Sequence, residues 1–553
     1  ALALALPAQA PDFPTARLEG VVVDPMQRPV AGAEVVVEVD GEERARTHSD
    51  GEGTFVVGKL PQGVVVVRAT TSTPDIGGTW VDLLGIDRGF AHVTTMPARK
   101  VSGTVRDRDG NSVAGAWVVS APYDGIEFVH ASCVVQADAQ GHYELSHVPF
   151  GNVLLRAWAP GYDAGQATLD GAVDRQQDLI VQADGIDMQT FRLLDADAAQ
   201  RQAARLVVTA SLGGLPVPLP PPLRRLSPDE RGEVIVRGWP RGDVIKAWFT
   251  VPGALVTPPR HTTVANVNDA HWRFHVGASA ACIRGRLAGG GLRVGNRLVL
   301  VQPIAAEGSL WRVVGLTAAD GSFTLPSPVD GGLDFALRLC AEDAAVAGDP
   351  QSPCWYVATH ESVEHRVPIV PAASVHVRAR TSEGEPARGA EVLVFAARSE
   401  PRSYPGLEEP LFAYGNVLAR GVTGIDGEVT IHGLQFEPED HISCLVLGAE
   451  GWREAVTDVP HGRRADPGPV LLQRAADVEC LAGDGNSGPA PASRIALRSN
   501  RMFLQTYQRL APGRDGKLLV RGLLPGGYAA GPLDGPRMFL LPLSAGENAT
   551  VVQ

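Results

Sequence analysis

The sequence predicts an all-β chain built as a tandem array of about six small β-sandwiches. Three observations lead to this prediction. A turn signal that combines Asp with Gly recurs six times, and successive Asp residues are 88 to 106 residues apart. Short runs of alternating apolar residues flank the copies, as half-buried strands require. No long stretch shows the apolar periodicity of a helix.

Each copy of the repeat is centred on its turn. In the first three copies Gly follows Asp after two residues, whereas in the last three copies Asp and Gly are adjacent. An Asp side chain accepts hydrogen bonds from the backbone that follows it, and Gly adopts positive φ, so both favour turns. We therefore expect structural turn formers, and not catalysts, at Asp50, Asp138, Asp229, Asp320, Asp426 and Asp515.

The turns are predicted to join pairs of strands. Apolar runs follow the turn directly at 54–60, 141–148, 232–239 and 516–523. After a second turn, further strands are predicted at 64–70, 152–159, 243–249, 335–340 and 442–449. Upstream of the turn, another strand pair is predicted at 18–39, 101–121 and 375–396. A Gly-Ala pair within each of these segments allows a neighbouring backbone to approach closely.

The repeat divides the chain into predicted domains. We place the sandwiches at 17–97, 98–183, 184–277, 278–370, 371–474 and 475–553, with the third and fourth divergent. Because each unit of such an array mainly touches its neighbours, we expect an elongated or gently curved molecule.

The order of the motifs resembles the carboxypeptidase regulatory-like domain family. In the second copy, Gly103 to Asp107 has the pattern Gly-x-Val-x-Asp, Gly115-Ala116 follows, and 159–162 reads Ala-Pro-Gly-Tyr. The first, second and fifth copies match well, and the sixth matches through its second half. The resemblance implies a transthyretin-like, Ig-related sandwich of seven strands, found in tandem in exported bacterial proteins. These motifs are structural and do not specify a ligand.

The N-terminal residues and the charge bear on location and partners. Residues 1–10, ALALALPAQA, read as an apolar segment with a cleavage signature, so we interpret 1–16 as a signal-peptide remnant and leader. We expect a secreted, periplasmic or cell-surface bacterial protein. The net charge of −13 without a basic cluster argues against a nucleic-acid partner. No run approaches the ~20 apolar residues of a membrane span.

Six cysteines in 553 residues are too few for a disulfide framework. Cys340 and Cys354 flank a predicted loop between successive strands, and export permits oxidation, so we expect a disulfide between them. Cys133, Cys444 and Cys480 are each alone in their copies, and we expect buried free thiols.

No run of residues has the spacing of a catalytic or metal site. The peptidase that gives the family its name needs a zinc-binding His-x-x-Glu, and the closest run, at 360–365, fails the His-Glu-x-x-His spacing by one residue. Asp-Gly-Asn sequences at 109–111 and 484–486 leave weak calcium binding open, although ordinary turns use the same residues. We expect no cofactor and no enzyme activity.

An insertion in the fifth copy is the candidate binding loop. Residues 399–416 contain Tyr404, Phe412 and Tyr414 among Pro, Gly and Glu. Aromatic residues on an extra loop of a rigid sandwich are typical of a binding surface, and the alternative is a loop folded over its own sandwich. Trp158 and Trp248 occupy corresponding positions in two copies, which favours packing over sugar stacking.

Two function classes remain open. The favoured one is a non-catalytic exported scaffold or adhesion-type protein with an unknown protein or glycan partner at the cell surface. The alternative is a carbohydrate-binding or accessory module that works with a separate enzyme. Measured binding to a glycan array separates the two classes.

Overall fold

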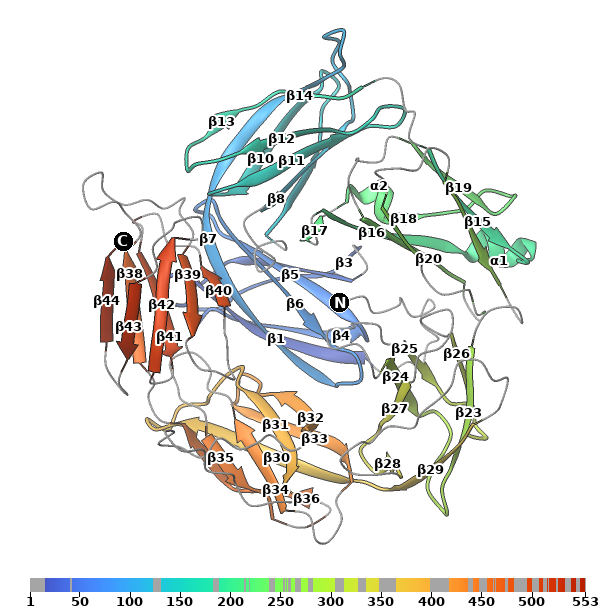
Figure 1. Ribbon diagram of the computed structural model, residues 1–553, viewed down its shortest axis with the longest axis vertical. Helices are drawn as coiled ribbons and strands as arrows, with labels where there is room; N and C mark the ends of the chain where they lie inside the picture. The colour runs from blue at the N-terminus through green and yellow to red at the C-terminus, as the bar shows by residue number, and fades with distance from the viewer. Residues whose placement is uncertain are drawn as a thin grey trace.

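The structure is a computed structural model, and strands make up almost all of its regular elements (Figure 1). The predicted all-β class is confirmed. The structure describes residues 15–39, 42–122, 131–182, 188–212, 215–217, 219–237, 244–251, 254, 256, 260–263, 270–276, 282–303, 313–326, 335–347, 365–397, 417–435, 441–446, 455–460, 462, 464–472, 476–481, 495–499, 507–510, 515, 517–523, 526–532, 539–543 and 548–552.

The first sandwich is formed by the N-terminal strands. Its strands are β1 (Thr15–Val23), β2 (Glu34–Val39), β3 (Glu42–His48), β4 (Thr54–Pro61), β5 (Val64–Thr70), β6 (Asp75–Asp82) and the start of β7 (Arg88–Arg106). One layer has the order β4-β1-β7 and the other the order β3-β2-β5-β6. Leu18, Val35 and Val67 are fully buried between the layers, because alternate residues of each strand point inward.

The second sandwich shares strand β7 with the first. The second half of β7 pairs with β10 (His142–Pro149), β13 (Arg175–Gln176) and β14 (Leu179–Ile180). The facing sheet has the order β12 (Gly165–Leu169), β11 (Val153–Trp158), β8 (Trp117–Pro122) and β9 (Cys133–Gln136). The predicted boundary between 97 and 98 therefore falls inside a continuous strand of 19 residues, so no linker separates the two sandwiches.

The third sandwich contains the two short helices found among the described residues. Its first sheet has the order β19 (Glu233–Arg237), β15 (Met188–Leu194) and β22 (Ala270–His275). Its second sheet has the order β17 (Leu215–Val217), β16 (Arg205–Leu212), β20 (Val244–Thr250) and β21 (Arg260–Thr263), and β18 (Arg225–Leu226) also pairs with β16. The helices are α1 (Ala198–Ala203) and α2 (Pro221–Arg224).

The fourth sandwich has two smaller sheets. One has the order β26 (Ser322–Pro326), β23 (Cys282–Ala288), β29 (His365–Pro371) and β28 (Ala344–Val346). The other has the order β25 (Val313–Leu316), β24 (Leu298–Pro303) and β27 (Phe335–Cys340). Buried residues of both sheets form one apolar cluster, which includes Val299, Leu337 and Val367.

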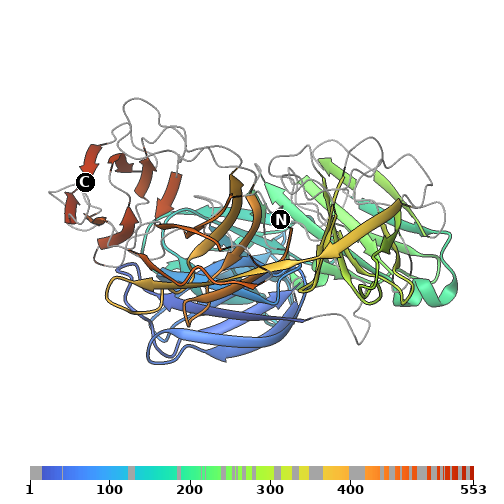
Figure 2. The same ribbon diagram turned by 90° about the horizontal axis from the view of Figure 1, so that it is seen from below.

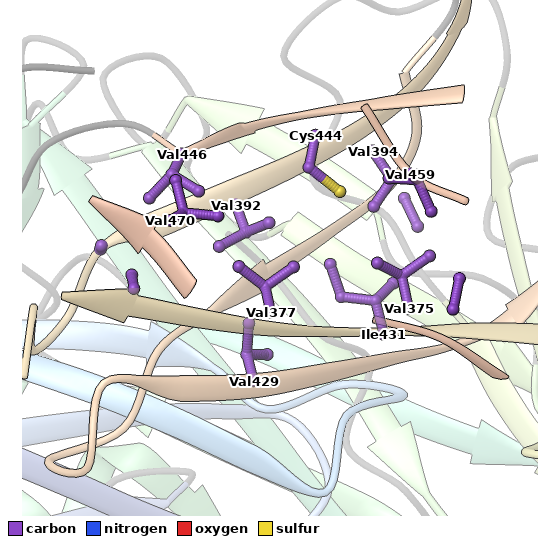
Figure 3. Packing of buried hydrophobic residues seen from close by; sticks show 14 of the residues in the cluster. Val375, Val377, Val392, Val394, Val429, Ile431, Cys444, Val446, Val459 and Val470 are labelled. Atoms are coloured by element: carbon purple, nitrogen blue, oxygen red, sulfur yellow. The ribbon is translucent and has the colours of Figure 1, made fainter. Parts of the chain in front are cut away.

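The fifth sandwich encloses the core shown in Figure 3. Its first sheet contains β33 (Glu428–Leu434), β30 (Ala373–Thr381), β36 (Arg464–Ala465) and β37 (Pro469–Leu472). Its second sheet has the order β32 (Val417–Val422), β31 (Glu391–Ala397), β34 (His441–Val446) and β35 (Ala455–Asp458). Val375 and Val377 of β30 pack with Val392 and Val394 of β31, and Cys444 completes the buried cluster.

Two C-terminal sheets follow. One has the order β41 (Lys517–Leu523), β38 (Ala476–Leu481) and β44 (Asn548–Val552). The other has the order β40 (Tyr507–Leu510), β39 (Ile495–Ser499), β42 (Gly526–Pro532) and β43 (Phe539–Leu543).

The same connections recur along the chain. The first strand of each sandwich, and β38 in the C-terminal sheets, pairs antiparallel with the strand that follows the Asp-Gly turn. The same strand pairs parallel with the last strand or strands of its unit. The repeat in the sequence thus corresponds to a repeated strand arrangement.

The expected elongated array is wrong. In Figure 1 the first sandwich lies in the middle and the later ones lie around it, and Figure 2 shows the same molecule from below. The first sandwich contacts the third through Arg225 and Glu42, and the C-terminal sheets through a hydrogen bond from Leu519 N to Pro25 O. The expectation failed because it considered only neighbours in sequence, whereas the outer faces of the first sandwich also bind distant units.

Candidate functional site

The six repeat Asp side chains accept backbone hydrogen bonds in their turns. In the first three copies the carboxylate accepts from the N–H groups two and four residues later, as Asp138 does from Gln140 and His142, both at 2.8 Å. Asp320, Asp426 and Asp515 accept from the backbone N–H two residues later, at 3.0 to 3.1 Å.

The Asp residues of the early and later copies occupy different turn positions. In the first copy Gly53 N donates to Asp50 O, so Asp50 begins the turn. In the fifth copy Gly427 N donates to Gly424 O, so Asp426 is the third residue of its turn. The carboxylates of the two forms therefore point from different places on the turn.

The glycine at the end of the turn is required on two grounds. Gly427 has φ of +73°, and a Cβ there would lie 2.5 Å from the Ala379 carbonyl oxygen. Gly53 has the same φ, with the Val22 carbonyl oxygen at 2.5 Å. Only glycine combines positive φ with so close an approach of a neighbouring strand.

Hydroxyl groups that the sequence analysis missed support three of the turns. Thr423 Oγ1 donates to Ala387 O at 2.6 Å and accepts from Ala390 N at 2.8 Å. Ser49 and Thr317 make the corresponding pairs of bonds in the first and fourth sandwiches. The available signal was a Ser or Thr directly before the first residue of the turn.

The turn of the fifth sandwich docks on the first sandwich, where it meets a buried carboxylate. Glu19 of β1 is 0% exposed, and its Oε2 accepts from Ile425 N at 2.8 Å. Its Oε1 lies 2.8 Å from Arg88 Nη2, which is also 3.0 Å from Asp426 Oδ2. Arg88 Nη1 reaches Glu428 O at 3.3 Å, so one guanidinium bridges both units.

Apolar contacts surround this polar group. Val21, Val23 and Phe90 of the first sandwich pack with Val422 and Ile425 of the fifth. At the margin of the contact Arg388 Nη2 lies 2.8 Å from Glu52 Oε2, which belongs to the turn of the first sandwich. We call the contact formed by Glu19, Val21, Val23, Glu52, Arg88, Phe90, Arg388, Val422, Ile425 and Asp426 the first–fifth joint.

The electrostatics of the first–fifth joint favour its charged state. Burial opposes the charge on Arg88, but hydrogen bonds to Glu19 and Asp426 outweigh it and raise the pKa of the guanidinium. Burial also opposes the charge on Asp426, yet the bonds from Arg88 and from Glu428 N hold the pKa of this carboxyl below its usual range. The ion pair therefore persists at neutral pH.

A second, half-buried charge group joins the first three sandwiches. Arg68 of β5 forms an ion pair with Glu38 of β2 and donates through Nη1 to Ser132 O of the second sandwich at 3.0 Å. Arg224 Nη1 of the third sandwich lies 3.7 Å from Glu38 Oε2. Burial lowers the pKa of both arginines, and the charge of Arg224 lowers that of Arg68 further.

The fourth sandwich contacts the first through apolar residues. Leu84 packs in one cluster with Leu298 and Leu300, and Cys340 lies at its edge. A Cβ on Gly85, which has φ of +74°, would lie 2.6 Å from Cys340 Sγ. The sulfur of Cys340 therefore lies close against the backbone of the first sandwich.

Four residues of the predicted sites lie outside the described part of the chain. Tyr404, Phe412 and Tyr414 lie outside the described residues, as does Cys354, so the binding loop and the Cys340–Cys354 disulfide stay predictions. Residues 1–14 of the interpreted leader also lie outside them.

The two compared tryptophans take part in packing. Trp158 is 8% exposed and joins the apolar cluster of the third sandwich, and Trp248 is 3% exposed. Burial leaves neither ring face open to a sugar.

Two described cysteines are free thiols: Cys444 is buried as expected, whereas Cys133 is only half-buried. Burial raises the pKa of Cys133 to about 11 and that of Cys444 to about 12. Cys133 Sγ also donates to His147 O at 2.9 Å. Neither thiol forms an appreciable thiolate at neutral pH, so neither is an effective nucleophile.

Two absences apply to the part of the chain that the structure describes. There, no cluster of three or more His, Cys, Asp or Glu residues has an arrangement that could hold a metal ion. No helix among the described residues has the length and apolar composition needed to cross a membrane.

Comparison with known proteins identifies one domain family. The family model of the carboxypeptidase regulatory-like domain matches residues 17–74, which confirms the predicted resemblance there. This range extends from β1 to the loop that precedes β6, within the first sandwich. No curated protein matches the chain.

Solved structures with similarity to parts of the chain include bacterial pilins. A Streptococcal ancillary pilin is 12% identical and covers 49% of this chain and 98% of its own, with a TM-score of 0.20. The shaft pilin spaA from Lactobacillus rhamnosus GG is 11% identical over 31% of this chain and 99% of its own, with a TM-score of 0.15. The Bacillus anthracis TIE protein is 14% identical and covers 47% of this chain and 50% of its own, with a TM-score of 0.14.

Proposed function

We propose that this chain is a non-catalytic exported scaffold, in which the first sandwich holds the later units in a fixed arrangement. The observation that carries the proposal is the buried carboxylate of Glu19, which contacts residues more than 400 positions away in the sequence. A buried charge is tolerated only where partners satisfy it. The partners of Glu19 include Ile425 N of the fifth sandwich, so its role is to fix two units together.

The second charge group supports the same role. Glu38, Arg68 and Arg224 bring three sandwiches to one point. Buried and half-buried charged side chains thus connect the sandwiches. A rigid arrangement of domains is what a presenting scaffold needs.

We further propose six domains, at 17–97, 98–183, 184–277, 278–370, 371–474 and 475–553. The recurrence of one strand arrangement supports this division. In this proposal the inserted loop with Tyr404, Phe412 and Tyr414 binds a protein or glycan partner at the cell surface. Deletion of residues 400–416 is expected to abolish partner capture while the unfolding transition of the fifth sandwich is retained.

Small-angle X-ray scattering of the full chain tests the fixed arrangement. We expect a compact particle for the natural chain and a larger radius of gyration for Glu19→Gln, because the neutral amide no longer attracts Arg88. Glu144→Gln is the matched control, since Glu144 pairs with Lys100 on the exposed face of a single sandwich. An extended particle for the natural chain would contradict the proposal.

One observation favours the alternative of a carbohydrate-binding module. Trp80 of β6 is 41% exposed, and an exposed indole face is a surface on which a sugar ring can stack. This second candidate predicts binding to a glycan array that is lost in Trp80→Ala. Binding that persists in Trp80→Ala but disappears on deletion of residues 400–416 assigns the ligand to the inserted loop.

A further inference from the structure

We propose that the chain is built to bear tension between its ends, an inference that rests on the proposed scaffold function. The relevant feature is the pairing of the strands through which the chain enters and leaves each unit. These strands are parallel neighbours in β1 with β7, β7 with β13 and β14, β15 with β22, β23 with β29, β30 with β36 and β37, and β38 with β44.

Parallel pairing determines how a pulling force acts on the hydrogen bonds. In a parallel pair, the start of one strand and the end of the other lie at opposite ends of the ladder. Tension along the chain therefore slides the strands past each other and loads all their hydrogen bonds together. If the strands were antiparallel, the same tension would open the bonds one after another from one end.

The first sandwich shows the longest of these ladders. The parallel register runs from Arg17 opposite Arg88 to Val23 opposite Thr94, and Arg17 N also donates to Asp87 O at 2.7 Å. On the other side of β1 the ladder is supported by β4, so that β1 is the central strand of this layer.

The tension then passes directly into the second sandwich, because β7 continues into it without a linker. At the crossing, Arg99 is 1% exposed and its guanidinium donates to the carbonyl oxygens of Asp170, Gly171 and Gly151. These bonds attach β7 to two loops of the second sandwich. The attachment opposes sliding of β7 along its own axis.

The contacts between distant units carry the pulling force at a different stage from the parallel strand pairs. The first–fifth joint and the bond from Leu519 N to Pro25 O connect the first sandwich directly to the fifth sandwich and to the C-terminal sheets. Tension therefore reaches these contacts before it acts on the second, third and fourth sandwiches. Their release lets the fifth sandwich and the C-terminal sheets move away from the first sandwich, which lengthens the molecule while every sandwich stays folded.

Single-molecule pulling on the full chain tests this proposal. With handles at the two chain ends, we expect an early lengthening at low force and then separate unfolding events at severalfold higher force. In a second arrangement, the handles are attached at Glu34 and His48, which lie opposite each other at the open end of the antiparallel β2–β3 pair. Pulling there separates the two strands from that end. We expect that pair to open at severalfold lower force than the end-to-end unfolding events require.

Variants separate the joint from the strand ladders. Glu19→Gln is expected to lower the force of the early event and to leave the later events unchanged, and the later events show in each trace that the variant is folded. The control Glu144→Gln is expected to change neither. Equal unfolding forces in the two pulling directions would overturn the tension proposal, even for a protein that is compact in solution scattering. An extended particle in scattering would instead refute the scaffold arrangement.

Discussion

Phe55 lies opposite Gly20 across the β1–β4 pair, and its ring covers the glycine. A Cβ on Gly20 would lie 2.4 Å from Phe55 Cζ and equally close to the Ala91 carbonyl oxygen. The fourth sandwich repeats this arrangement with Phe323 opposite Gly285, where the Cβ would lie 2.4 Å from the ring. Both sandwiches thus pair a glycine in the first strand with an aromatic residue after the turn.

We expect Gly285→Ala to destabilise the fourth sandwich by about 1–3 kcal/mol through overpacking. The second substitution Phe323→Leu is expected to restore part of this loss, because the nearest backbone atom, His365 O, lies at 3.1 Å and can yield slightly. Chemical denaturation of both variants measures the recovery.

The corresponding change in the first sandwich is the comparison. Gly20→Ala should not be rescued by Phe55→Leu, because the Ala91 carbonyl oxygen belongs to the backbone and remains in place. Equal rescue in both sandwiches would show that the aromatic ring alone decides the fit.

Asp138 and Asp426 are predicted to respond differently to substitution. Asp138→Ala removes hydrogen bonds within one turn and is expected to cost about 1 kcal/mol. Asp426→Ala also removes the ion pair with Arg88, so we expect both a stability loss and an increased radius of gyration. Scattering and denaturation of the two variants, measured side by side, check this difference. An unchanged radius for Asp426→Ala would show that this carboxylate acts only in its turn.

The first–fifth joint is expected to loosen in acid. The folded-state pKa of Asp426 is lowered, so the contribution of its charge to stability is complete above the ordinary Asp pKa of about 4. That contribution is lost as the pH falls through the lowered value. We expect a constant radius of gyration from about pH 5 to 8 and an increase below about pH 4, at fixed ionic strength. A transition near pH 6.5 would point to histidine instead.

The cysteines are expected to fall into two groups. Cys133 and Cys444 should resist alkylation of the native protein at pH 7.5 and react after denaturation, because burial raises the pKa values of both thiols. Cys340 and Cys354 should appear as one linked peptide in non-reducing mass spectrometry of oxidised protein. Separate, alkylated peptides for both residues would refute the disulfide.

The strand arrangement could be predicted from the sequence because its signals are local. Alternating apolar residues and Asp-Gly turns act over a few residues, and they predicted β4, β10 and β41 close to their observed positions. The different Asp–Gly spacings of the two forms distinguish Asp50 from Asp426 in the sequence, and the backbone hydrogen bonds then define the turn position of each.

The assembly could not be predicted because its contacts are distant in sequence. Glu19 was visible as a charged residue in an apolar strand, but nothing near it indicates Ile425 as its partner. The positions that correspond to the Gly20–Phe55 pair are also hard to recognise in other units. The third sandwich places Phe191 opposite Val234, and the fifth places Val377 opposite Val429. The bulky and small positions are redistributed, so a motif search for Gly and Phe misses them.

The single strand shared by the first two sandwiches has a consequence for how such a chain can evolve. Domain duplication and exchange need a point in the gene where one folded unit can be cut from the next, and in β7 that point lies between Pro97 and Ala98, where its pairing changes from the first sandwich to the second. A break elsewhere between Arg88 and Arg106 would leave one of the two sandwiches with an incomplete closing or opening strand. Recombination that preserves both folds must therefore take place at this point or in the loops outside β7.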